Sequence, residues 1–221
     1  MRRLLTARLG MVVLAGVFVL TGMASAAHAD QYILNIDHCT GTCGTPPFGT
    51  IDVVQNGAND VKVTVTLKAG EVFANSAGGG VGFNLSGNPT ISASNVTTGF
   101  ALVSTTAGAI GFDGLGNFEY EIACTACSGG NPGNPAGPLN FDIIAAGLTP
   151  AAFKEFSTHP PGDTDSYFGV DIRGTNANTG VVGTNTVTVV PEPGTLALVG
   201  TALIGVGAWA RRRVRGLLRT A

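Results

Sequence analysis

Apolar and polar residues alternate along much of the middle of the chain. Between residues 61 and 68, valine and leucine alternate with lysine and threonine, which is the period-two pattern of a strand with one buried face. Glu119 and Glu121 alternate with apolar neighbours in the same way, so both are expected on the solvent-facing side of their strand. Further segments with this alternation are Val81/Phe83/Leu85, Phe118/Tyr120/Ile122, Leu139/Phe141/Ile143, Phe168/Val170/Ile172 and Val187/Val189.

Clusters of turn-forming residues separate the alternating segments. Gly, Asn and Pro gather at residues 56–57, 78–80, 86–89 and 131–135. Many short strands joined by such turns predict an all-β fold, an antiparallel β-sandwich of jelly-roll type. One short helix is also expected, with Thr149 as its cap, Pro150 at its first position and Ala151 to Phe156 continuing it.

The composition agrees with strands and turns rather than a helical bundle. Of the 221 residues, 33 are glycine and only 12% are charged. Basic residues concentrate at the two ends, whereas the segment 30–190 holds four basic and thirteen acidic residues. An acidic domain of this kind repels phosphate backbones, so no nucleic-acid partner is expected.

The first 29 residues have the three regions of a secretory signal peptide. Arginines at positions 2, 3 and 8 form the positive region, and Leu9 to Leu20 form a short apolar core. The small-x-small sequence Ala27-His28-Ala29 predicts cleavage between Ala29 and Asp30. The alternative is an anchor helix that is never cleaved.

The other end of the chain combines prolines, an apolar run and arginines. Val190-Pro191-Glu192-Pro193-Gly194 precedes an apolar segment at about 195–210, and Arg211, Arg212 and Arg213 follow it. About sixteen helical residues rise roughly 24 Å, slightly less than a typical hydrocarbon core, so a single thin transmembrane helix is expected. The positive-inside rule keeps the arginines of both ends in the cytoplasm, which places the middle of the chain outside.

This tail resembles the PEP-CTERM sorting signal of Gram-negative bacteria. The resemblance rests on Pro191, Glu192 and Pro193, the small apolar helix, and the cluster Arg211, Arg212 and Arg213, in that order. It implies recognition by a membrane-embedded exosortase that cuts the tail and passes the protein outward. The alternative is a permanent anchor. The expected divisions are a signal peptide at 1–29, an ectodomain at 30–189, a sorting signal at 190–215 with its motif at 191–193 and its arginine cluster at 211–215, and a cytoplasmic tail at 216–221.

The four cysteines form two close pairs, Cys39/Cys43 and Cys124/Cys127. An exported protein meets oxidising conditions, so two disulfides are expected, and local pairing is favoured among the three possible pairings. The alternatives are a four-thiolate zinc site, with His38 nearby as an alternative ligand, and free or reactive thiols, including a redox-active Cys124-Thr125-Ala126-Cys127 motif.

Sequence motifs for catalysis are absent. The chain has no nucleophile elbow, no His-Glu-x-x-His and no phosphate-binding loop. Asp163-Thr164-Asp165 could offer oxygen ligands to calcium, but it lacks the spacing of a full ligand loop, and a solvated loop is expected. Glu119 and Glu121 could in principle serve glycoside hydrolysis. The prediction is no enzyme, no catalytic or metal-binding residues and no cofactor.

Taken together, these patterns predict an exported, non-enzymatic surface or matrix protein. Its expected partners are the exosortase, the membrane and the exopolysaccharide layer, in which it would be structural or adhesive. The alternative is a carbohydrate-binding module of the envelope. Against that alternative, residues 30–189 contain no Trp and only three Tyr.

Overall fold

The computed structural model describes residues 28–159 and 162–191, together with Gly200, Thr201 and Gly205 of the tail. Residues His28–Glu192 form one compact unit. The predicted signal peptide up to residue 27, most of the predicted membrane span, Glu192, Pro193 and the arginine cluster lie outside the described residues. In the part of the chain that is described, no helix is long and apolar enough to cross a membrane.

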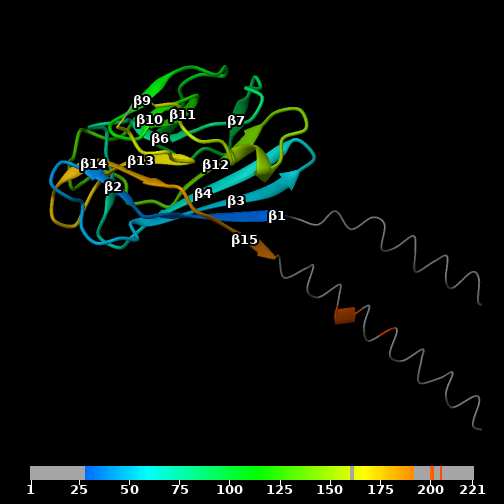
Figure 1. Ribbon diagram of the computed structural model, residues 1–221, viewed down its shortest axis with the longest axis horizontal. Coiled ribbons are helices and arrows are strands. Elements are labelled where there is room, and N and C mark those ends of the chain that lie inside the picture. The colour runs from blue at the N-terminus through cyan, green and yellow to red at the C-terminus, as the bar shows by residue number, and fades with distance from the viewer. Residues whose placement is uncertain (1–27, 160–161, 192–199, 202–204, 206–221) are drawn as a thin grey trace, which may run out of the picture. The chain divides into compact units, whose positions relative to one another are not determined.

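The described residues contain fifteen strands and one short 3₁₀ helix (Figure 1). The strands are β1 (His28–Leu34), β2 (Ile36–Cys39), β3 (Gly49–Gly57), β4 (Asp60–Leu67), β5 (Val72–Phe73), β6 (Gly80–Phe83), β7 (Ser92–Ser94), β8 (Phe100–Leu102), β9 (Ile110–Phe112), β10 (Gly116–Phe118), β11 (Tyr120–Cys124), β12 (Leu139–Ile144), β13 (Phe168–Arg173), β14 (Thr179–Thr184) and β15 (Val187–Pro191), and the helix is η1 (Pro150–Phe153).

Two antiparallel sheets pack face to face around one apolar core. The first sheet has the strand order β15-β1-β3-β4-β12-β7. The second has the order β2-β14-β13-β6-β11-β8, with β5 paired to β13. Rings from the two sheets meet in the interior, as Tyr32 of β1 meets Phe168 of β13 with centroids 4.9 Å apart. The predicted all-β, antiparallel architecture is confirmed, and the layers are those of a β-sandwich; the jelly-roll form stays a prediction.

Strand β4 shows how the alternation creates the core. Val61, Val63 and Val65 are fully buried, whereas Lys62 and the other side chains of the opposite face are exposed or half-buried. Burying each valine contributes about 1.5–3 kcal/mol relative to exposing it, so the strand has a strongly preferred register and face.

The central strands of the second sheet, β14, β13, β6 and β11, are buried on both faces, which the alternation did not predict. The hairpin β9–β10 covers its outer face with a small apolar cluster of Phe112, Leu115, Phe118 and Val181. Beneath this hairpin lie Gly82, Gly169 and Gly183, which are direct partners across β6, β13 and β14. A Cβ at Gly82 would lie 2.8 Å from both phenylalanine rings, so the glycines allow the close approach of the hairpin.

The expected helix is present but shorter and tighter. It is a 3₁₀ turn that ends at Phe153 instead of Phe156, and the Thr149 side chain makes no capping hydrogen bond. Pro150 stands in the first turn as expected. Phe153 is fully buried and stacks on Phe168 with ring centroids 5.9 Å apart, so packing holds this turn in place.

Replacing Gly82 by alanine should destabilise the domain by about 1–3 kcal/mol, because the new methyl group meets two rings that are themselves packed. Urea unfolding of the mature domain measures the change in the free energy of unfolding. The matched control is Gly57→Ala on the exposed end of β3, where a Cβ finds ordinary contact at 3.5 Å. Equal stabilities of the two variants would contradict the close packing of the hairpin.

Candidate functional site

The two ends of the compact unit are paired with each other in the first sheet. Strands β1 and β15 are antiparallel, with His28 opposite Pro191, Ala29 opposite Val190 and Asp30 opposite Val189. The predicted signal-cleavage residues Ala29 and Asp30 therefore lie inside β1, and the first residue of the Pro-Glu-Pro motif ends β15 (Figure 1). The structure brings together two predicted processing sites that are far apart in sequence.

Asp30 fixes the end of this strand pair against the body of the domain. Its side chain is buried, and its Oδ2 atom lies 3.0 Å from the Lys154 Nζ atom. Two positions further along, Tyr32 is fully buried in the core opposite Val187. At the same end of the strand pair, Pro191 lies opposite His28 and has no backbone N–H to donate. Asp30 thus anchors the end of the pair that carries the first residue of the motif.

The cysteines form two local disulfides, Cys39–Cys43 and Cys124–Cys127, as the sequence favoured. Cys39 pairs with Gly180 on β14, which pairs with Ile172 on β13, while Cys124 lies two strands beyond on β11. Four strand spacings separate the two bridges by about 19 Å. The zinc alternative needs all four sulfurs in one coordination sphere, and this arrangement does not provide it.

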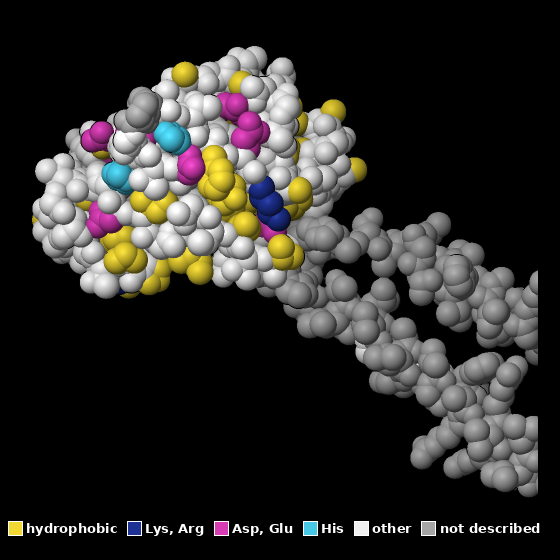
Figure 2. Space-filling view, in the orientation of Figure 1, with side chains coloured by type: hydrophobic (Ala, Val, Ile, Leu, Met, Phe, Trp, Pro, Cys, Tyr) yellow, Lys and Arg dark blue, Asp and Glu magenta, His cyan; other side chains and the backbone are white. Residues whose placement is uncertain are grey.

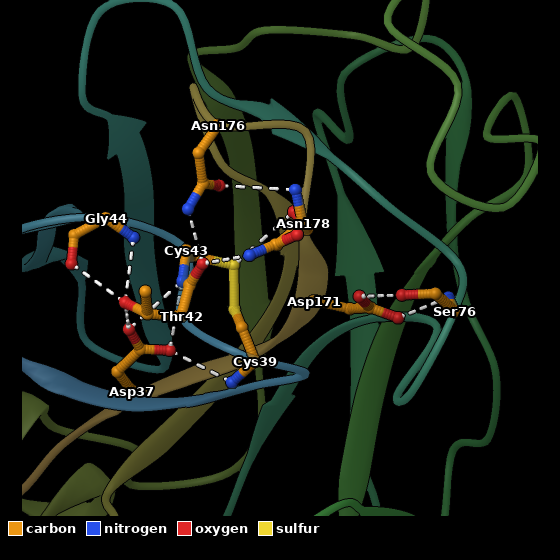
Figure 3. The surroundings of a disulfide bond; sticks show 9 residues. All are labelled: Asp37, Cys39, Thr42, Cys43, Gly44, Ser76, Asp171, Asn176 and Asn178. Atoms are coloured by element: carbon orange, nitrogen blue, oxygen red, sulfur yellow. Dashed lines mark hydrogen bonds between the residues drawn. A yellow bond between two sulfur atoms is a disulfide. The ribbon is translucent and has the colours of Figure 1, made fainter.

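Asp37 organises the loop closed by the first disulfide (Figure 3). Its carboxylate accepts hydrogen bonds from the backbone N–H of Cys39 at 2.9 Å and of Cys43 at 3.1 Å. The Thr42 hydroxyl donates to it at 2.6 Å. Asp37, Cys39 and Cys43 are close enough to hold a metal ion, but the two sulfurs are bonded to each other. The carboxylate therefore shapes a loop.

Asn176 and Asn178 tie the same loop to the β13–β14 turn. Both side-chain amides donate to the carbonyl of Thr42, at 2.6 and 2.8 Å (Figure 3). The β13–β14 turn is thus held against the loop of the first disulfide. Sequence reasoning missed Asp37, although an Asp two residues before a Cys in a Gly-Thr loop is typical of side-chain-to-backbone turns.

A buried carboxylate, Asp171 on β13, holds the loop that precedes β6. It is fully buried, and its Oδ2 atom accepts the backbone N–H groups of Ser76, Ala77 and Gly78 at 2.5, 2.7 and 2.9 Å. The Ser76 hydroxyl donates to Oδ1 at 2.8 Å (Figure 3). These bonds compensate the cost of burying the charge and fix the loop against the sheet.

The expectation that Glu121 faces solvent is wrong. Its side chain is 6% exposed, and its Oε1 atom has no hydrogen-bond partner among the described residues. The β9–β10 hairpin and the loop at Gly79 cover this face of the strand. The polar positions of the alternating pattern therefore do not all face solvent. Burial, followed by the charge of Asp171, raises the pKa of Glu121 to about 7.

Glu119 differs from Glu121, so the two do not form a matched catalytic pair. Glu119 is half-buried, its Oε2 atom accepts the Leu85 N–H at 3.1 Å, and burial raises its pKa. A glycosidase needs two carboxylates that both reach one substrate. Glu121 is instead enclosed beneath a hairpin.

The Asp163-Thr164-Asp165 segment packs on the β9–β10 turn. Thr164 donates its N–H to the Gly114 carbonyl at 2.9 Å, and its hydroxyl lies 3.1 Å from His38 Nε2. Asp165 pairs with His159. Among the described residues, the three-ligand group close enough for an ion is the one at Asp37, so this segment belongs to no such group.

Stability should fall as pH rises from about 4.5 to 7, because the folded state keeps a proton on Glu121 that the unfolded chain has released. Glu71, also buried and with a pKa raised to about 7 mainly by desolvation, acts in the same direction. Glu121→Gln should remove about 1–3 kcal/mol of this loss. Urea unfolding between pH 4.5 and 8 gives the slopes, and an unchanged slope in Glu121→Gln would contradict the assignment.

Comparison with known families identifies the tail. The family model for the PEP-CTERM protein-sorting motif matches residues 189–213, which span the end of β15, the Pro-Glu-Pro motif and the arginines. No curated protein and no solved structure matches the chain. The motif indicates exosortase processing and a membrane-associated C-terminus. The chain is therefore a PEP-CTERM domain-containing protein, exported and sorted to the cell envelope or surface.

Proposed function

We propose that the β-sandwich is a non-enzymatic structural or adhesive protein of the extracellular polymer layer, delivered there when the exosortase cuts its tail. The observation that carries the proposal is the sorting motif, which begins at the last residue of the last strand. Cutting there would release a domain whose fold is already complete. The segment at about 195–210 would span the membrane until the cut is made.

The interior of the domain supports a structural role. Aromatic rings predominate among its largest fully buried side chains, and two disulfides close its loops. The carboxylates of Asp37 and Asp171 accept hydrogen bonds from backbone N–H groups. Groups used in this way stabilise loops and are poorly placed for proton transfer to a substrate.

The alternative, a carbohydrate-binding module, has one specific observation in its favour. Phe156 is 40% exposed and stacks on the half-buried Tyr167, with ring centroids 4.2 Å apart and planes inclined by 15°. The face in Figure 2 gathers hydrophobic side chains beside charged ones. An exposed ring supported from behind is a surface on which the apolar face of a sugar can stack.

The sorting proposal predicts a mature chain that ends near residue 193 and lacks the arginines. Replacing Pro191, Glu192 and Pro193 by alanine should leave the protein embedded, uncut and absent from the extracellular fraction. Mass spectrometry of the C-terminal peptide from surface or medium protein measures this. Deletion of residues 211–213 is the control, and it should disturb orientation or retention because several charges no longer hold the tail inside. Intact Leu217–Ala221 on most mature molecules would overturn the proposal.

A pull-down with the host's exopolysaccharide separates the structural role from sugar binding at the aromatic pair. If the alternative is correct, Phe156→Ala should reduce binding at least about fivefold, since a lost stacking contact is worth about 1 kcal/mol. Val103→Ala, at a residue that is 54% exposed, is the matched surface control. Equal binding of the exopolysaccharide by both variants and by the parent protein would exclude the aromatic pair as the sugar-binding surface.

A further inference from the structure

We infer that the β9–β10 hairpin opens locally when Glu121 beneath it ionises, so that the hairpin covers the second sheet at acid pH and uncovers it above neutral pH. The inference concerns residues of the compact unit alone and does not depend on how the tail is processed. It goes beyond the pH dependence of the stability of the whole domain, because it assigns the response to one segment that moves while the two sheets stay folded.

The hairpin packs on the second sheet through an apolar cluster that is separate from the main core. Phe112, Leu115 and Phe118 of the hairpin form this cluster with Val181 of β14. The core between the two sheets is built from other side chains. Loss of the hairpin contacts therefore leaves that core in place, and a segment of this kind can detach at a lower cost than the unfolding of the domain.

Few backbone hydrogen bonds join the hairpin to the rest of the domain. Strands β9 and β10 form a two-stranded sheet of their own. Among the described residues, the backbone hydrogen bonds from residues 110–118 to other segments are Asn117 N–H to Thr158 (2.7 Å), Thr158 N–H to Asn117 (3.0 Å), Asp113 N–H to Ala77 (3.1 Å) and Thr164 N–H to Gly114 (2.9 Å). Their partners outside the hairpin lie in loops, so the hairpin can open without breaking the ladders of the two large sheets.

Glu121 lies on the face of the second sheet that the hairpin covers. It is the direct partner of Gly82, and a Cβ at Gly82 would lie 2.8 Å from the rings of Phe112 and Phe118. Facing residues of an antiparallel pair direct their side chains to the same side of the sheet. The buried Glu121 side chain, whose Oε1 atom has no hydrogen-bond partner among the described residues, is therefore enclosed by the hairpin and by the loop at Gly79.

Ionisation of Glu121 opposes closure of the hairpin. Burial, followed by the like charge of Asp171, raises the pKa of Glu121 to about 7. The other charged side chains on the elements around it are Arg173 of β13, Asp113 of the hairpin turn and Glu119 beside β11, and the segments 75–83 and 100–102 carry none. Closure is therefore favoured fully below 4.5, the ordinary value of an exposed Glu, and this advantage is lost as pH rises to about 7.

Opening of the hairpin uncovers a flat apolar surface. Gly82, Gly169 and Gly183 present no side chains on this face of the sheet, and the rings of Phe112 and Phe118 lose the surface on which they pack. The domain therefore presents more apolar surface to its surroundings above neutral pH than in acid.

Hydrogen–deuterium exchange of the full chain in detergent, at pH 5 and pH 8, measures the opening. The amides of Asp113 and Asn117 report on the hairpin, and those of Val63 and Val65 in β4 report on unfolding of the whole domain. After correction for the intrinsic exchange rate, hairpin opening should increase on the order of 50-fold between the two pH values, because Glu121 titrates between them. At pH 8 the hairpin amides should exchange at least about tenfold faster than those of β4 and almost independently of dilute urea.

Two variants separate the ionising group from the apolar contact. Glu121→Gln keeps the shape of the side chain but cannot ionise, so its hairpin opening should be the same at pH 5 and pH 8. Val181→Ala removes methyl groups from the apolar cluster and leaves Glu121 in place. Its hairpin opening should rise at least about fivefold at both pH values, with an unchanged ratio between them.

Each measurement can overturn the inference. A pH dependence that persists in Glu121→Gln refutes Glu121 as the group that opens the hairpin. Hairpin and β4 amides that exchange at equal rates with equal urea dependence refute local opening, and the parent chain alone decides this point if Glu121→Gln does not fold. Hairpin opening in Val181→Ala equal to that of the parent refutes the apolar cluster as the contact that closes the hairpin.

Discussion

Phe83 lies where all parts of the interior meet. Its ring contacts Tyr120 within its own sheet, Phe141 from the opposite sheet, Phe153 from η1 and Phe168 from the neighbouring strand, with centroid distances between 5.6 and 6.3 Å. Such aromatic pairs contribute about 0.5–1.5 kcal/mol each beyond the area they bury. The two sheets and the 3₁₀ turn are thus fixed relative to one another, and β1, next to the edge strand β15, is held with the first sheet.

The outer face of the second sheet depends on the absence of side chains. Gly82 and Gly169 leave a flat surface on which the hairpin packs, and across β6 the charge of Asp171 adds to the burial that raises the pKa of Glu121. One carboxylate is compensated by three backbone N–H groups, whereas the Oε1 atom of the other has no hydrogen-bond partner among the described residues. The close packing of the β9–β10 hairpin also buries Glu121. The same packing therefore stabilises the fold and makes its stability depend on pH.

Features that depend on residues close together in the sequence could be predicted, whereas features that depend on contacts between distant segments could not. The burial of Val61, Val63 and Val65 is visible because period-two alternation is a local property of a strand that covers one core. The sorting motif is visible because a protease reads a local segment. The burial of Glu121 could not be predicted, because the hairpin that covers it consists of two three-residue strands, β9 and β10. An alternating pattern of that length is too short to recognise. The glycines that alternate with apolar residues at 80 and 82 were the available signal of a second buried face.

The pairing of His28 with Pro191 could not be predicted, because it depends on closing almost the entire domain. A slip of one residue between β1 and β15 would turn one of the two strands over, so the register is held by the burial of Tyr32 and Asp30 on β1 and by the packing of Val187 on β15 against the core. Since Pro191 is the last residue of the strand, the same burial determines where the motif begins relative to the folded surface. The core of the domain therefore fixes the position of Pro191, the first residue of the Pro-Glu-Pro motif, in the first sheet.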